Sequence, residues 1–220
     1  MIQADYGNAL TLIGRFDDAQ KNLEEALKLA RSLKSDPTIA MILNLQGERY
    51  YYGGDFKSAR PLFDQALQIA AHAKDRPEIL NAKFNLARIS IREGHAAAAV
   101  STLKELVKDA DAMGQKYLST KCSLYAGVAL VESRNYSQGR QEIEAVLRKA
   151  QDQGMKSLLP QANYWLAIAL RGSGNNAEAA SHFQQAAQLL EEMHQESRSD
   201  ALLKREDLRP IVEEAARKTS

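Results

Sequence analysis

The side chains best suited to catalysis or metal binding are four histidines and one cysteine, and they form no catalytic pattern. Glu191 and His194 have the i, i+3 spacing of one half of a di-iron motif, in which helices supply carboxylate and imidazole ligands. That motif needs partners on other helices, and the remaining histidines do not repeat the spacing: His72, His95 and His182. A solvent-exposed pair at Glu191 and His194 is therefore favoured, and we predict no metal site.

Other motifs that carry chemistry are also missing from the sequence. Cys122 is the single cysteine, which excludes an internal disulfide and a zinc site built on cysteine pairs. The sequence contains no Walker-type phosphate loop and no nucleophile elbow. We therefore predict that the chain is not an enzyme and that it needs no cofactor.

The strongest pattern in the sequence is a repeat of fixed length, with a period of about 40 residues. One column holds glycine, with arginine in one copy: Gly14, Gly54, Gly94, Arg134 and Gly174. Nine residues later each copy has a large apolar residue: Leu23, Phe63, Leu103, Ile143 and Phe183. Seven residues before the glycine column each copy has a small residue: Gly7, Gly47, Ala87, Gly127 and Ala167. Columns in register across five copies indicate a repeat protein.

Each copy has the apolar spacing of two amphipathic helices joined by a tight turn. A small residue such as Gly47 lets one helix approach another closely, so we expect substitution by a bulky residue to damage folding. Asp36 and Pro37 are typical of a helix start. Gly114 and Gly154, which are also one period apart, suit the left-handed residue that ends a helix.

These columns resemble those of the tetratricopeptide repeat family, in its long version with about 40 residues per repeat. The family's order of small, aromatic or leucine, small and large apolar residues is found in the second copy as Gly47, Tyr50, Ala59, Phe63 and Ala66. The resemblance implies an all-α, right-handed superhelical solenoid of antiparallel helix hairpins. We expect about five repeats over residues 1–198 (1–36, 37–76, 77–116, 117–156 and 157–198) and a C-terminal capping helix over 199–220, interrupted near Pro210.

Composition limits the classes of partner. The 220 residues carry a net charge of +1, 26% of them are charged, and the pI is about 7.8. This balance argues against generic nucleic-acid binding, which needs a strongly basic surface. No apolar run is long enough to cross a bilayer, so we predict neither a nucleic-acid nor a membrane partner and expect a reduced, cytoplasmic setting.

The first repeat is short and begins abruptly with apolar residues such as Leu10 and Ile13. A terminal repeat normally has a polar outer face. We therefore interpret Met1 as the start of a fragment that further repeats or another domain precede. An exposed first repeat also predicts weak self-association of the chain.

In the resembled family, ligands bind the concave surface lined by the first helix of each hairpin. The corresponding positions predict a groove for a protein or peptide: Asn44, Glu48, Tyr51, Tyr52, Asn81, Phe84, Asn85, Arg88, Arg92, Lys121, Tyr125, Tyr164 and Arg171. Several of the apolar residues can equally be packing residues, and the cations can equally be solvated. We expect Arg88 to be exposed enough that its reversal to glutamate spares the fold.

Three functions agree with this sequence. The first is a scaffold that binds a partner protein or peptide in the groove through side-chain pockets. The second is a regulatory or sensory module of a larger bacterial signalling protein, such as a kinase or transcription regulator. The third is a self-association module. The sequence identifies neither the partner nor the parent protein.

Overall fold

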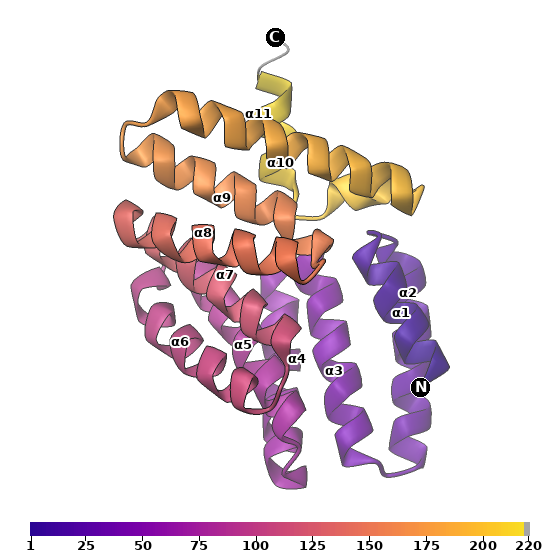
Figure 1. Ribbon diagram of the computed structural model, residues 1–220. Coiled ribbons are helices and arrows are strands. Elements are labelled where there is room, and N and C mark those ends of the chain that lie inside the picture. Colours follow the sequence, from indigo (N-terminus) through magenta and orange to yellow (C-terminus); the bar gives the residue numbers. More distant parts are fainter. Residues whose placement is uncertain (218–220) are drawn as a thin grey trace. The chain divides into compact units, whose positions relative to one another are not determined.

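The computed structural model describes residues 1–217, and all of the regular structure in that range is helical (Figure 1). The chain folds as two compact units, 1–89 with 197–207 and 90–196 with 208–220. The expected capping helix, 199–220, ends with three residues, 218–220, that lie outside the described range. The all-helical fold predicted from the repeat is confirmed.

The first unit contains two complete antiparallel hairpins and most of a fifth helix. As labelled in Figure 1, the helices are α1 (Ile2–Leu12), α2 (Phe16–Ser32), α3 (Asp36–Tyr52), α4 (Phe56–Ala73) and α5 (Arg76–Arg92), whose last three residues belong to the second unit. The residues at the N-termini of α3 and α4 explain why these two helices begin where they do. Pro37 occupies the first turn of α3, and Asp55 caps α4 by accepting the backbone N–H of Ser58 at 3.0 Å.

The second unit continues the same hairpin pattern. Its elements are α6 (Ala96–Ala112), α7 (Lys116–Glu132), α8 (Tyr136–Asp152), the short 3₁₀ helix η1 (Lys156–Leu158), α9 (Leu159–Gly172), α10 (Asn176–Ser197) and α11 (Arg209–Arg217). Helix α11 packs against α9 (Figure 1). No described helix combines the length and the apolar composition that crossing a membrane requires.

The small-residue column packs directly against the large apolar column, as the sequence predicts. A Cβ atom added at Gly7 would lie 2.8 Å from Leu23, and one added at Gly47 would overlap the ring of Phe63. The pair recurs in the second unit, where a Cβ at Gly127 would lie 2.5 Å from Ile143. The absence of a side chain thus sets the distance between the two helices of a hairpin.

The turn columns are confirmed by backbone geometry. Gly114 and Gly154 have φ of +69° and +66°, in the left-handed region expected for a residue that ends a helix. Arg134 stands in the glycine column and also adopts a positive φ, +62°. The repeat thus imposes its turn conformation even on a residue for which that conformation is unfavourable.

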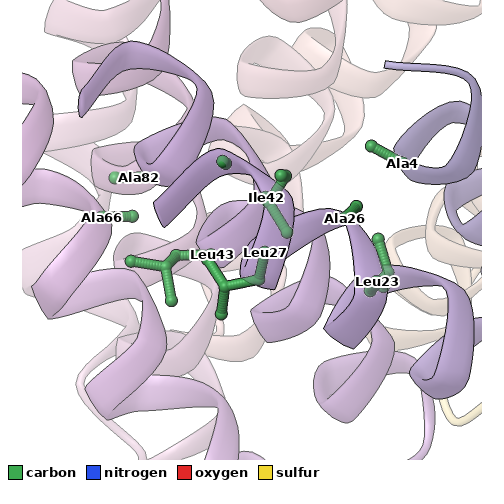
Figure 2. Packing of buried hydrophobic residues seen from close by; sticks show 9 residues of the cluster. Ala4, Leu23, Ala26, Leu27, Ile42, Leu43, Ala66 and Ala82 are labelled. Carbon is green, nitrogen blue, oxygen red and sulfur yellow. The ribbon is translucent and has the colours of Figure 1, made fainter. Parts of the chain in front are cut away.

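The hairpins of the first unit share a core of aliphatic and alanine side chains. Figure 2 shows leucines and isoleucine interleaved with alanines from α1 to α5, which lets neighbouring helices pack closely: Ala4, Leu23, Ala26, Leu27, Ile42, Leu43, Ala66 and Ala82. All eight are buried. Layers of large and small residues thus join consecutive hairpins into one core.

The C-terminal region is not one helix. Residues Asp200–Lys204 form a 3₁₀ helix (η2), Arg205 is extended, and residues 206–208 form a turn. Pro210 stands in the first turn of α11, where proline is tolerated. Residues 197–207 belong to the first unit, whereas α11 belongs to the second. The predicted division at residue 198 between repeats and cap remains a prediction.

Replacing Gly47 by valine tests the packing column. The new side chain would overlap Phe63, which is fully buried, so we expect a loss of about 1–3 kcal/mol of unfolding free energy. Urea unfolding measures this loss. Ala71→Val, at an exposed position of α4, is the matched control and should cost only a few tenths of a kcal/mol. Equal unfolding midpoints for the two variants would contradict the packing role of Gly47.

Candidate functional site

First helices of neighbouring hairpins touch in each unit, and this contact builds the surface on which the predicted groove residues lie. Helix α1 contacts α3 in the first unit, and α7 contacts α9 in the second. Eight of the thirteen predicted residues lie on α3 and on the part of α5 that belongs to the first unit: Asn44, Glu48, Tyr51, Tyr52, Asn81, Phe84, Asn85 and Arg88. The first unit therefore holds most of the candidate site.

Arg88 is the centre of an aromatic and polar cluster between α3 and α5. Its guanidinium carbon lies 3.7 Å from the ring centroid of Tyr51, 5.0 Å from that of Tyr52 and 5.4 Å from that of Phe84. The same guanidinium donates to Asn85 Oδ1 at 3.0 Å and lies 3.6 Å from Glu48 Oε1. The aromatic faces and the carboxylate together stabilise a cation inside the unit.

The expected exposure of Arg88 is wrong, because its side chain is only 1% accessible to solvent. Tyr51, Tyr52, Phe84 and Asn85 are buried with it. The helical period placed these residues on one face correctly, but the neighbouring helix covers that face. Arg88 therefore joins α3 to α5, and a ligand carboxylate does not reach it in this conformation.

A second polar cluster lies along the same pair of helices. Asn44 Nδ2 donates to Glu78 Oε2 at 2.8 Å and to the Glu78 carbonyl oxygen at 3.2 Å, and Asn81 Nδ2 donates to Glu78 Oε1 at 3.3 Å. Asn44 is 4% exposed, and its Oδ1 is buried without a hydrogen bond from any residue in the described range. A buried acceptor in this state is costly unless a donor reaches it.

The carboxyl group of Glu78 has a perturbed pKa. Burial raises the pKa of Glu78 above its ordinary value, and the charges of Asp75 and Glu48 raise it further, whereas the hydrogen bonds from Asn44 and Asn81 oppose the change. The net direction is upward because desolvation outweighs the two amide donors. The cluster thus places several hydrogen-bond acceptors where they are partly buried from solvent.

The predicted residues of the second unit do not form an equivalent cluster. Tyr125 is buried, Arg92 is exposed at the end of α5, and the Lys121 ammonium lies 5.8 Å from the ring centroid of Tyr117. Tyr125 therefore serves packing in this structure. Lys121 and Arg92 remain predicted groove residues.

Arg171 contacts the C-terminal helix α11, and Tyr164 packs against Phe183 of α10. Arg171 Nη1 lies 3.3 Å from Glu214 Oε1 of α11, and its guanidinium stacks over Phe183, 4.8 Å from the ring centroid. Burial raises the pKa of Tyr164, and Glu214 adds to the effect. Helix α11 thus engages a position where the sequence predicts ligand contact.

The residues considered for catalysis do not converge. No group of three or more potential metal ligands occurs in the described part of the chain. The Glu191 and His194 side chains lie 3.5 Å apart as a local pair on α10. Cys122 is fully buried, and desolvation raises the pKa of its thiol to about 12, so the thiol stays neutral and unreactive near neutral pH.

Sequence reasoning missed two residues that connect separate elements of the first unit, Glu78 and Arg205. Glu78 could have been found, because it precedes Asn81 by three residues and lies on the same face of α5. Arg205 carried no such signal. It lies outside the repeat, and its Nη1 donates to the Leu12 carbonyl oxygen at 2.8 Å, a contact between residues 193 positions apart in the sequence.

Comparison with family models agrees with this architecture. One model described as tetratricopeptide repeat matches residues 1–72, and a second with the same description matches residues 44–113 and 126–193. The chain belongs to the tetratricopeptide repeat family. The family inferred from the columns is thereby confirmed, and the version with about 40 residues per repeat remains a prediction. No curated protein sequence matches the chain.

Several solved structures share this fold. PlcR of Bacillus thuringiensis, solved with the peptide PapR7 and DNA, has a TM-score of 0.72 and 12% identity over 91% of this chain and 72% of PlcR. BtubC from P. vanneervenii has a TM-score of 0.63 and 19% identity over 82% of this chain and 75% of that protein.

Aspartyl phosphate phosphatase F from Bacillus subtilis is similar over a smaller part of its length. Its TM-score is 0.65 at 16% identity, over 84% of this chain, and the chain spans only 50% of that protein. At such identities these structures show a shared fold.

Reversing the charge of Arg88 should now damage the fold. Arg88→Glu buries a second carboxylate beside Glu48 and removes the cation from three aromatic faces, so we expect a loss of about 3–5 kcal/mol. Arg92→Glu, at an exposed position one helical turn later, is the control and should change stability little. Urea unfolding that gives the same midpoint for both variants would show that Arg88 is not a structural residue.

Glu78→Gln tests the raised pKa. Because the folded state holds the Glu78 proton up to a higher pH than the unfolded chain, ionisation costs stability as pH rises from the ordinary glutamate pKa through the raised one. The variant should therefore be more stable than wild type near pH 7, and the difference should vanish below about pH 4. Urea midpoints across this range measure it, with the exposed Glu105→Gln as control. A difference independent of pH would contradict the assignment.

Proposed function

We propose that this chain is a non-catalytic interaction module that binds a protein or peptide at the α3–α5 face of its first unit. The observation that supports this most is the buried Oδ1 atom of Asn44, which no described residue satisfies. Such an acceptor costs about 1–3 kcal/mol when it is left without a donor. The Oδ1 atom is covered in this conformation, so a ligand that supplies this donor must first displace the side chains over it, and it then recovers part of that free energy.

The chemistry of the cluster indicates which ligand groups fit. Asn44 and Glu78 offer carboxylate and amide oxygens, and Glu48 adds a second carboxylate nearby. Hydrogen-bond donors such as a main-chain amide, a lysine or an arginine complement this set. We therefore infer a peptide whose donor group reaches Asn44, rather than one whose carboxylate pairs with Arg88. A cytoplasmic setting remains part of this proposal.

A regulatory module is the second candidate. The fold is shared with PlcR, whose structure contains a peptide and DNA, and with a signal transduction ATPase that carries a tetratricopeptide repeat sensor. The chain spans 29% of that ATPase. In this alternative, ligand binding to the repeats controls an attached domain. The gene sequence around the region that encodes this chain would decide between the two candidates.

Self-association is supported by a separate observation on the first hairpin. Several large apolar side chains there are exposed, including Ile2 at 86% and Leu33 at 69%. A second copy could bury such residues. Light scattering over a wide range of protein concentration tests this candidate, and a constant monomer mass would exclude it.

Selection from a random peptide display library tests the main proposal directly. We expect the wild-type chain to enrich peptides with a common basic or amide-rich motif and the Asn44→Leu variant to lose them. Lys83→Ala, at an exposed position of α5, is the control and should retain the same peptides. Circular dichroism must first show that both variants keep their helices. Equal enrichment by Asn44→Leu and wild type would contradict the proposed site.

A further inference from the structure

Residues 199–207, here named the C-terminal strap, lie on the turn ends of the first two hairpins. The strap includes η2, the extended Arg205 and the turn residues 206 and 207, and it belongs to the first unit. Leu202 is 2% exposed, and the side chains of Arg205 and Asp207 are 9% and 6% exposed. A segment outside the repeat is thus buried on the repeat surface.

The strap supplies hydrogen-bond donors to three carbonyl oxygens at the ends of α1 and α3. Ser199 Oγ donates to the Ile13 carbonyl at 2.9 Å, Arg205 Nη1 to the Leu12 carbonyl at 2.8 Å, and the Glu206 backbone N–H to the Tyr52 carbonyl at 2.8 Å. The last carbonyls of a helix have no partner within the helix and carry partial negative charge. The turn ends therefore form an acceptor surface suited to a cation.

Arg205 contacts this surface through its Nη1 atom and through the face of its guanidinium. It lies over the ring of Tyr52, 4.2 Å from the centroid. Its Nε and Nη2 atoms bind the two carboxylate oxygens of Asp207 at 3.0 and 2.7 Å, which fixes the plane of the group. The surface itself supplies an aromatic face and a helix end, two features by which binding sites recognise arginine, and the carboxylate comes from the strap.

Gly14 allows the strap backbone to approach. A Cβ at this position would overlap the Ala201 carbonyl group. Gly94 stands in the same column with a similar φ, +88° against +79°, and a Cβ there would have no atom within 4 Å. Gly14 thus serves two needs, a left-handed turn and close contact with the backbone of η2.

We propose that this surface is a peptide-binding site and that the strap occupies it in cis. The partner that fits is a peptide that adopts the strap's conformation and has its pattern. In that pattern a leucine is followed three residues later by arginine, glutamate and aspartate, as in Leu202, Arg205, Glu206 and Asp207. This inference goes beyond the proposed function, because it uses the turn ends of α1 and α3 instead of the Asn44 cluster. Failure of one proposal leaves the other standing.

Tethering explains why the site is closed in the isolated chain. The residues before and after the strap are covalently continuous with it, so its effective concentration at the surface is on the order of millimolar. A free peptide with the same contacts competes poorly against this concentration. Weakening the strap opens the site without changing the surface itself.

Fluorescence anisotropy with a labelled peptide of the sequence of residues 199–207 tests the proposal. The full-length double variant Leu202→Ala, Arg205→Ala should bind the peptide at least tenfold more tightly than wild type does. Lys204→Ala, an exposed cation of the same strap, is the control and should behave as wild type. A peptide with alanine in place of its arginine should not bind. Failure of the double variant to bind, with its helices intact, would overturn the proposal.

Gly14→Ala and hydrogen exchange provide independent checks. Gly14→Ala and Gly94→Ala place alanine at a similar positive φ, but only the side chain added at Gly14 would block the strap position. Each is added to the double variant Leu202→Ala, Arg205→Ala. Peptide binding should be lost with Gly14→Ala and kept with Gly94→Ala. In wild type, the Glu206 amide should exchange at least tenfold faster than buried amides of α3, because the strap detaches while the hairpins stay folded. Equal exchange rates would mean that the strap is an inseparable part of the fold, and would overturn the proposal.

Discussion

The close approach of the two helices in each hairpin is the constraint on which the rest of the structure depends. Gly47 against Phe63, and the matching pairs in other copies, bring the helix backbones together. First helices of consecutive hairpins within a unit also touch, as α1 touches α3 and α7 touches α9. The two polar clusters and the surface at the turn ends are built on these hairpins.

The buried polar residues between α3 and α5 differ in their hydrogen-bond partners. Arg88 is buried and surrounded by partners, so its charge contributes to joining α3 and α5. Asn44 is also buried, yet one of its two polar atoms has no donor among the described residues. Aromatic rings face the Arg88 guanidinium and stabilise its charge, whereas for Asn44 we propose that a ligand supplies the donor. Sequence position alone does not distinguish them, since both follow the same helical period.

The repeat was predictable because its evidence is local and is present in five copies. Helix starts, left-handed turn residues and the packing column all follow from residue types at fixed spacing, as at Pro37 and Gly114. Depth of burial was not predictable, because Arg88 is covered by side chains from a helix whose distance the sequence does not state. The strap was not predictable either, since Arg205 meets Leu12 through a contact without a repeated counterpart.

Side-chain amide NMR of the isotopically labelled chain tests the central claim, that Asn44 and its neighbours receive a ligand donor. A peptide recovered by selection is titrated into the protein while the Nδ2 signals of Asn44 and Asn81 are followed. The account predicts that these two signals shift in step with peptide occupancy and that the exposed Asn175 signal does not. Saturable binding without a shift at Asn44 and Asn81 would contradict it.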